Sequence, residues 1–65
     1  MKKYKVVDLY DGKDVLGYAD NLSEVKKIAK GQVEDTDGEC AIYYYPYDDN
    51  KRKYDFSKRV FLQSC

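Results

Sequence analysis

The sequence predicts an α+β fold of two layers, in which one helix packs on a mainly antiparallel four-stranded sheet in the order ββαββ. Residues 21–33 carry apolar side chains three and four positions apart, which is the spacing of one helix face. Segments rich in β-branched and aromatic residues flank this stretch on both sides and indicate strands. With 65 residues, the chain has room for a single domain, residues 1–65, and hardly for a deep substrate cleft.

The first two strands are expected at residues 4–10 and 15–19, joined by Asp11-Gly12. Asp-Gly between two apolar runs is typical of a type I′ hairpin turn, because both central residues of that turn have positive φ. Gly17 in the second strand indicates a bulge or a close approach of the helix.

Val7 and Leu9 are expected to face the helix, because the alternative face of the first strand contains Asp8. The helix is expected to begin after Asn21, whose side chain can accept a hydrogen bond from the first turn while Glu24 reaches back to the backbone. Its apolar stripe is Leu22, Val25, Ile28, Ala29 and then Gln32 or Val33. The helix is expected to end near Val33, and Gly31 weakens it.

Residues 40–45 form the strongest predicted strand, with Cys40, Ile42 and Tyr44 on one face and Ala41, Tyr43 and Tyr45 on the other. Pro46 cannot donate to a ladder, so central pairing is expected to stop there, or else the strand lies at an edge. The last strand is expected at residues 59–63, and residues 54–56 are a candidate short strand.

Twelve basic residues balance twelve acidic residues, so the formal net charge is zero. This balance argues against a protein whose main task is to neutralise phosphates, although it allows a local basic patch. Because no apolar run approaches 18 residues and the basic N-terminus lacks a signal-peptide core, a cytoplasmic protein without a membrane span is expected. Cys40 and Cys65 are accordingly expected to be reduced thiols.

The sequence favours a protein without enzymatic activity, metal or cofactor. It contains no histidine to activate a serine or cysteine nucleophile. Asp35-x-Asp37-Gly38 resembles part of a calcium loop, but Val33 and Tyr44 occupy the first and last ligand positions, so a solvated turn is the better interpretation. The remaining carboxylate pairs lie in predicted loops, where strong pKa tuning is not expected.

The eight tyrosines are the unusual feature of the composition, since there is no tryptophan and there are only two phenylalanines. Tyrosine can fill a half-exposed strand, form a docking surface for a protein, or stack on the bases of a single-stranded nucleic acid. In the third interpretation, residues 51–53 and 58–59 supply the positive charge, while the acids at Asp48, Asp49 and Asp55 oppose it.

The order of these elements is a strand, an Asp-Gly hairpin, a second strand, the helix Asn-Leu-Ser-Glu-Val-Lys-Lys-Ile-Ala-Lys, the turn Asp-Thr-Asp-Gly-Glu-Cys and an aromatic strand. This order resembles that of small uncharacterised proteins of phages and mobile elements of Gram-positive bacteria. The similar part is residues 21–44, which carry no functional motif. The resemblance implies an inhibitor that binds a host or defence protein. An anti-CRISPR protein that disables a CRISPR nuclease, and so evades antiviral defence, is one such role.

The leading hypothesis is therefore a protein-binding module that acts in the bacterial cytoplasm as an inhibitor. Its expected partner-binding residues are Tyr43, Tyr45, Tyr47, Asp48, Asp49 and Arg52. The alternative hypothesis is a single-stranded nucleic-acid-binding protein that uses tyrosines on the open sheet face. Homo-oligomerisation through that face or an edge strand is a third.

Overall fold

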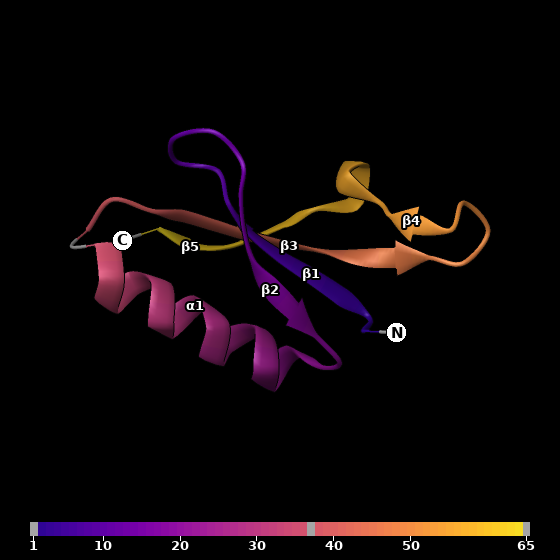
Figure 1. Ribbon diagram of the computed structural model, residues 1–65, viewed down its shortest axis with the longest axis horizontal. Helices are drawn as coiled ribbons and strands as arrows, with labels where there is room; N and C mark the ends of the chain where they lie inside the picture. Colours follow the sequence, from indigo (N-terminus) through magenta and orange to yellow (C-terminus); the bar gives the residue numbers. More distant parts are fainter. Residues whose placement is uncertain (1, 37, 65) are drawn as a thin grey trace.

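The computed structural model describes residues 2–36 and 38–64, which contain one α-helix and five strands. The elements follow one another as β1 (Tyr4–Asp8), β2 (Asp14–Ala19), α1 (Leu22–Thr36), β3 (Ala41–Asp48), β4 (Lys53–Tyr54), the 3₁₀ helix η1 (Phe56–Lys58) and β5 (Val60–Ser64). Figure 1 shows α1 along one side of the sheet, with the β3–β4 hairpin extending beyond the beginning of the helix. The predicted α+β fold with its ββαββ order is confirmed.

The sheet is antiparallel and has β3 at its centre. β1 lies between β2 and β3, and the other side of β3 pairs with β5 along its first half and with β4 along its second half. In the described residues the sheet has five strands and not the expected four, because Lys53–Tyr54 forms the additional two-residue strand β4. The candidate short strand at 54–56 is confirmed at Tyr54, which belongs to β4 and pairs with β3, but it does not include Phe56, which begins η1.

The core between sheet and helix contains Val6 of β1 and Ile42 of β3. The prediction that Val7 and Leu9 face the helix is wrong, because residues alternate along a strand and Val6 occupies that face. Asp8 lies on the helix side with Val6, where Gln32 of α1 donates a 2.8 Å hydrogen bond to it. A buried carboxylate with its own partners therefore takes the position where an apolar side chain was expected.

Gly17 has the role that its position predicts. Val6 pairs with Gly17 and Val7 pairs with Val15, so Leu16 is the extra residue of a bulge in β2. A Cβ added at Gly17 would lie 3.4 Å from the Ile28 Cδ1 atom, so glycine lets α1 pack closely on the sheet. The two-residue hairpin turn is not formed, since pairing ends at Asp8 and Asp14 and residues 9–13 make a longer loop.

The predicted helix start is confirmed. The Asn21 side chain accepts a hydrogen bond of 3.0 Å from the Glu24 amide, and the Glu24 carboxylate accepts one of 3.1 Å from the Asp20 amide. The helix passes through Gly31 and ends at Thr36, three residues beyond the predicted Val33. The Thr36 hydroxyl donates a 2.9 Å bond to the Gln32 carbonyl and so stabilises the additional turn.

Pro46 does not interrupt β3, contrary to the prediction. In an antiparallel strand the N–H and C=O of one residue point to the same side. The Pro46 carbonyl accepts a 2.8 Å hydrogen bond from the Asp55 amide, so its missing N–H also faces away from β1. On the β1 side, the Tyr47 amide donates to the Lys3 carbonyl at 2.8 Å, and the ladder continues past the proline.

Cys40 is buried and disulfide-bonded, so the prediction of a reduced thiol there is wrong. The prediction for Cys65 lies outside the described residues. No helix in residues 2–36 and 38–64 is long and apolar enough to cross a membrane.

Candidate binding cleft on the open sheet face

The open sheet face, which is the face turned away from α1, carries tyrosine rings from neighbouring strands. Lys5 of β1 pairs with Tyr18 of β2 on one side and with Tyr45 of β3 on the other, so these three residues form a row across the sheet. Farther along β3, Tyr47 pairs with Tyr54 of β4. Paired residues on one face lie close enough for their side chains to contact.

Tyr54 is the hub of this aromatic cluster. Its ring centroid lies 5.4 Å from that of Tyr18, 6.5 Å from that of Tyr45 and 5.1 Å from that of Tyr47. The Tyr54 hydroxyl donates a 2.8 Å hydrogen bond to the Lys2 carbonyl and ties the cluster to the beginning of β1. Burial raises the pKa of Tyr54, and the neighbouring tyrosines and Asp20 raise it further, so the ring stays neutral at physiological pH.

Tyr45, one of the residues expected to contact a partner, is almost fully buried, since only 1% of its surface is exposed. The short helix η1 places Phe56 against it at 5.3 Å between ring centroids, with the planes nearly perpendicular. The protein's own chain thus covers this part of the open sheet face. Val7, also fully buried, belongs to the same face, because it alternates with Val6.

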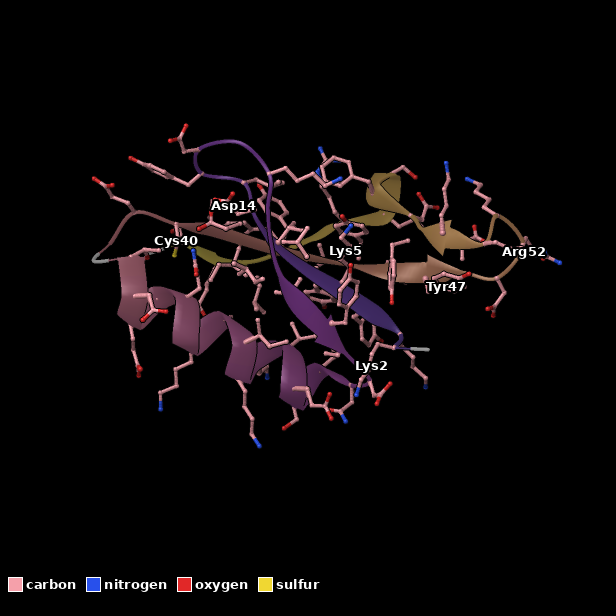
Figure 2. The ribbon with its side chains drawn as sticks, in the orientation of Figure 1. Lys2, Lys5, Asp14, Cys40, Tyr47 and Arg52 are labelled. Carbon is pink, nitrogen blue, oxygen red and sulfur yellow. The ribbon has the colours of Figure 1, made fainter. Side chains whose placement is uncertain are left out.

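A cleft of about 480 Å³ opens beside these rings, and we call it the basic cleft. Among the described residues, four cationic side chains line it and no carboxylate does. The cations are Lys5, Lys13, Arg52 and Lys53. The aromatic lining is Tyr18, Tyr45, Tyr47, Tyr54 and Phe56. Figure 2 shows Lys5 near the middle of the sheet and Tyr47 and Arg52 toward the β3–β4 hairpin.

Two of the acids that were expected beside the tyrosines, Asp48 and Asp55, have structural roles instead. Asp55 is 5% exposed, caps η1 by accepting from the Ser57 amide at 3.0 Å, and also accepts from the Ser57 hydroxyl. The bond from the Ser57 hydroxyl is the main reason why the pKa of Asp55 is lowered. Asp48 accepts from the amides of Asn50 and Lys51 at 2.9 and 3.2 Å and so shapes the β3–β4 turn.

A second cleft, of about 410 Å³, lies at the beginning of β1 and is lined by Lys2, Lys3, Tyr4, Pro46, Tyr47 and Asp49. Lys2 forms an ion pair with Asp20 at 2.9 Å, and this hydrogen bond and charge raise the pKa of Lys2. The positive charge of Lys2 is therefore largely matched within the chain.

The predicted partner-binding residues do not form one patch. Tyr47 and Arg52 line the basic cleft, Asp49 lines the second cleft, and Asp48 holds the turn. Tyr43 lies on the open sheet face against Phe61 of β5, at 5.2 Å between ring centroids.

Sequence reasoning missed Lys5, Lys13 and Tyr18 as cleft residues. The alternation of Lys5 with the helix-facing Val6 was the available signal, but Val7 had been assigned to the helix face.

The described part of the chain, residues 2–36 and 38–64, contains no group of three or more metal-ligating side chains that could hold a metal ion. A third cleft, of about 310 Å³, is acidic and is lined in part by Asp8, Asp11, Asp14 and Glu39. Figure 2 shows Asp14 and Arg52 well apart along the long axis. Lys13 of the basic cleft, however, directly precedes Asp14 in the chain, so the two clefts are close to one another at this point.

No protein-family model matches the chain, and neither a curated protein nor a solved structure matches it. The resemblance to phage proteins therefore stays a prediction.

Proposed function

We propose that the protein is a non-enzymatic binding module that holds single-stranded nucleic acid in the basic cleft. The observation that carries this proposal is the lining of the cleft, which combines four cationic side chains with four tyrosines and, in the part of the chain that the structure describes, includes no carboxylate. Proteins that bind single strands without strong sequence preference combine the same two features, because cations track the phosphates and aromatic rings stack on the bases. Tyr18 is 47% exposed and offers a ring for such stacking.

The zero net charge no longer weighs against this function. Of the three acids expected to oppose binding, Asp48 and Asp55 are held by hydrogen bonds within the turn and at η1, and Asp49 lines the second cleft. Since none of the three lines the basic cleft, a phosphate there would meet mainly positive charge.

The number of cations sets the expected salt dependence. Each phosphate contact on a single strand contributes roughly −0.7 to the slope of log K against log salt, so four contacts give roughly −2.8. Affinity should then fall about 50-fold between 50 and 200 mM salt.

Fluorescence anisotropy with a labelled oligothymidylate, titrated at several salt concentrations, tests this proposal. Lys53→Gln should reduce the steepness of the slope by about 0.7, because it removes one cleft cation. Lys26→Gln, an equal charge change at an exposed position of α1, is the matched control and should leave the slope unchanged. If the anisotropy of the oligothymidylate does not change when wild-type protein is added at 20 mM salt, the proposal is refuted.

A second candidate function is the predicted inhibitor, which would bind a bacterial host or defence protein with the adjoining part of the open sheet face. The apolar exposure of β5 favours it, because Phe61, which pairs with Tyr43 on the open sheet face, is 53% exposed. Exposed aromatic groups of this kind are enriched in protein interfaces. Affinity capture from a bacterial lysate with wild-type protein and Phe61→Ser tests it, since a specific partner should be lost from the variant.

The other predictions about context also remain proposals. A cytoplasmic location stays a prediction, and the disulfide at Cys40 counts against a strongly reducing compartment. Self-association through the open sheet face can be measured by light scattering over a range of protein concentrations.

A further inference from the structure

We infer that the floor of the basic cleft is a phosphate subsite formed by the hydroxyl of Tyr45 and the ammonium groups of Lys5 and Lys13. The inference deepens the proposed function and rests on it, because the phosphate would belong to the bound strand. It names the chemical group that the floor accepts.

The first observation is the Tyr45 hydroxyl itself. Tyr45 is 1% exposed, and its hydroxyl oxygen is buried with no hydrogen-bond partner among residues 2–36 and 38–64. Such a group loses its bonds to water on folding without replacement, so unpartnered buried hydroxyls are uncommon. A phenylalanine would fill the same space without this penalty. A ligand that bonds to the hydroxyl gives tyrosine an advantage at this position.

The second observation is the positive charge beside Tyr45. Lys5 is its direct neighbour in the β1–β3 register, and the Lys5 ammonium lies 6.0 Å from the centre of the adjacent Tyr18 ring. The Lys13 ammonium lies 5.7 Å from the centre of the Tyr45 ring and 4.5 Å from that of Phe56. No carboxylate among the lining residues neutralises either lysine.

These three groups together select the chemistry of the ligand. Each ammonium can only donate hydrogen bonds, and the hydroxyl can donate one. A group that satisfies all three must present several acceptor oxygens and carry negative charge, as a phosphate does. The edge of a base combines acceptors with donors and carries no charge, so it fits less well.

In this inference, Lys13 moves when the phosphate enters. Lys13 is exposed and belongs to the loop of residues 9–13, which lies outside the strand ladder. A phosphate that attracts its ammonium would draw Lys13 off the rings that it now covers. At about 480 Å³, the cleft has room for a nucleotide.

Tyr45→Phe is the decisive variant, because the inference predicts opposite effects on stability and binding. The melting temperature of the free protein should stay the same or rise, since the removed hydroxyl has no partner to lose. Affinity for oligothymidylate should fall about 10-fold or more, as expected for a lost hydrogen bond to a charged group. Tyr54→Phe is the control for stability and should lower the melting temperature, because its hydroxyl donates to the Lys2 carbonyl.

Oligonucleotides with a 5′-phosphate, a 3′-phosphate or neither distinguish the sources of the phosphate. If Tyr45→Phe loses the same affinity for all three oligonucleotides, the floor binds an internal phosphodiester. If it loses affinity for only one phosphorylated oligonucleotide, the floor binds a terminal phosphomonoester. Wild-type affinity in Tyr45→Phe for every oligonucleotide, or a lowered melting temperature of the free variant, would overturn the inference and leave the proposed function standing.

If wild-type protein binds no oligonucleotide, the proposed function fails, and NMR titration with inorganic phosphate decides the inference separately. Shifts of the Tyr45 ring and Lys13 side-chain resonances, absent on addition of equal chloride, support the subsite. Unchanged resonances overturn it.

Discussion

Asp8 offers the sharpest test of how the fold positions the basic cleft. Its carboxylate is 4% exposed and accepts hydrogen bonds from the Tyr10 amide at 2.9 Å, the Ala41 amide at 3.1 Å and the Gln32 side chain at 2.8 Å. One side chain thus joins β1 to the beginning of β3 and to α1. Because it fixes this end of the β1–β3 pair, it supports the register that places Lys5 beside Tyr45.

Asp8→Ala should lower the free energy of unfolding by about 2–4 kcal/mol. A hydrogen bond to a charged group contributes roughly 1.5–3 kcal/mol, but not all three bonds are lost in full. Tyr10 is exposed and Gln32 can rotate toward water, so the loss concentrates on the Ala41 amide. A chain of this length has roughly 3–10 kcal/mol of total stability. The melting temperature should therefore fall by about 10–25 °C.

Asp8→Asn is the matched control, with an expected cost of about 1 kcal/mol. Its remaining carbonyl oxygen can still accept from the Tyr10 and Ala41 amides. Its NH₂ group would face Gln32, whose side-chain amide can turn and present its oxygen.

The pH dependence of stability supplies the second readout. Burial raises the pKa of Asp8, but the hydrogen bonds from Tyr10, Ala41 and Gln32 outweigh it, and the net pKa lies below the usual 3.8. A lowered folded pKa means that the carboxylate stabilises the fold above the unfolded pKa and loses this contribution as pH falls through the folded pKa. Wild-type protein should therefore lose stability below about pH 4 more steeply than Asp8→Asn.

Thermal unfolding followed by circular dichroism from pH 2 to 7 measures the loss of stability in Asp8→Ala and the pH dependence of wild-type protein and Asp8→Asn. Parallel profiles for the two proteins, or a change under 1 kcal/mol in Asp8→Ala, would contradict the reasoning.

Two further substitutions test local features. Gly31→Ala should raise the free energy of unfolding by about 1 kcal/mol in urea denaturation, because Gly31 is exposed within α1 and an added Cβ would meet no atom within 4 Å; a lowered stability would contradict this. Asp48→Ala should lower the melting temperature by an amount equivalent to about 1 kcal/mol, because it removes the acceptor for two turn amides, whereas the neighbouring exposed Asp49→Ala should have little effect. Equal melting temperatures for these two variants would show that the turn does not depend on Asp48.

Features set by neighbours in the sequence could be predicted. The Asn21 cap, the bulge at Gly17 and the two faces of residues 40–45 each depend on a pattern within a few positions. The helix-facing side of β1 could not be read in this way, because Asp8 is satisfied by Gln32 and Ala41, which lie 24 and 33 positions away. An isolated strand gives no sign that its acid will find such partners.

The burial of Tyr45 was missed for a similar reason. Its cover is Phe56 in η1, which is held in place by the Asp55 cap and by the bond from the Asp55 amide to the Pro46 carbonyl. A three-residue 3₁₀ helix has too short a pattern to be recognised before this packing is known. The basic cleft depends on that packing, so the residues that line it could not be predicted from the sequence.

A neutral chain can carry a basic cleft because its acids are used elsewhere. Asp8 and Asp55 are buried with hydrogen-bond partners, and Asp20 pairs with Lys2. The molecule is 38 Å long, while electrostatic screening has a length of roughly 10 Å at 0.1 M salt and 30 Å at 0.01 M. At physiological salt, a phosphate near Arg52 and Lys53 should therefore respond to the nearby cations and hardly to the acids around Asp14, whereas a phosphate beside Lys13, which directly precedes Asp14 in the chain, should respond to both. Near 0.01 M salt the acids around Asp14 should also repel the phosphate at the cleft. The affinity for nucleic acid should therefore rise less steeply as the salt concentration is lowered further. The net charge of the chain therefore bears on long-range attraction, whereas the lining of the cleft determines binding at close range.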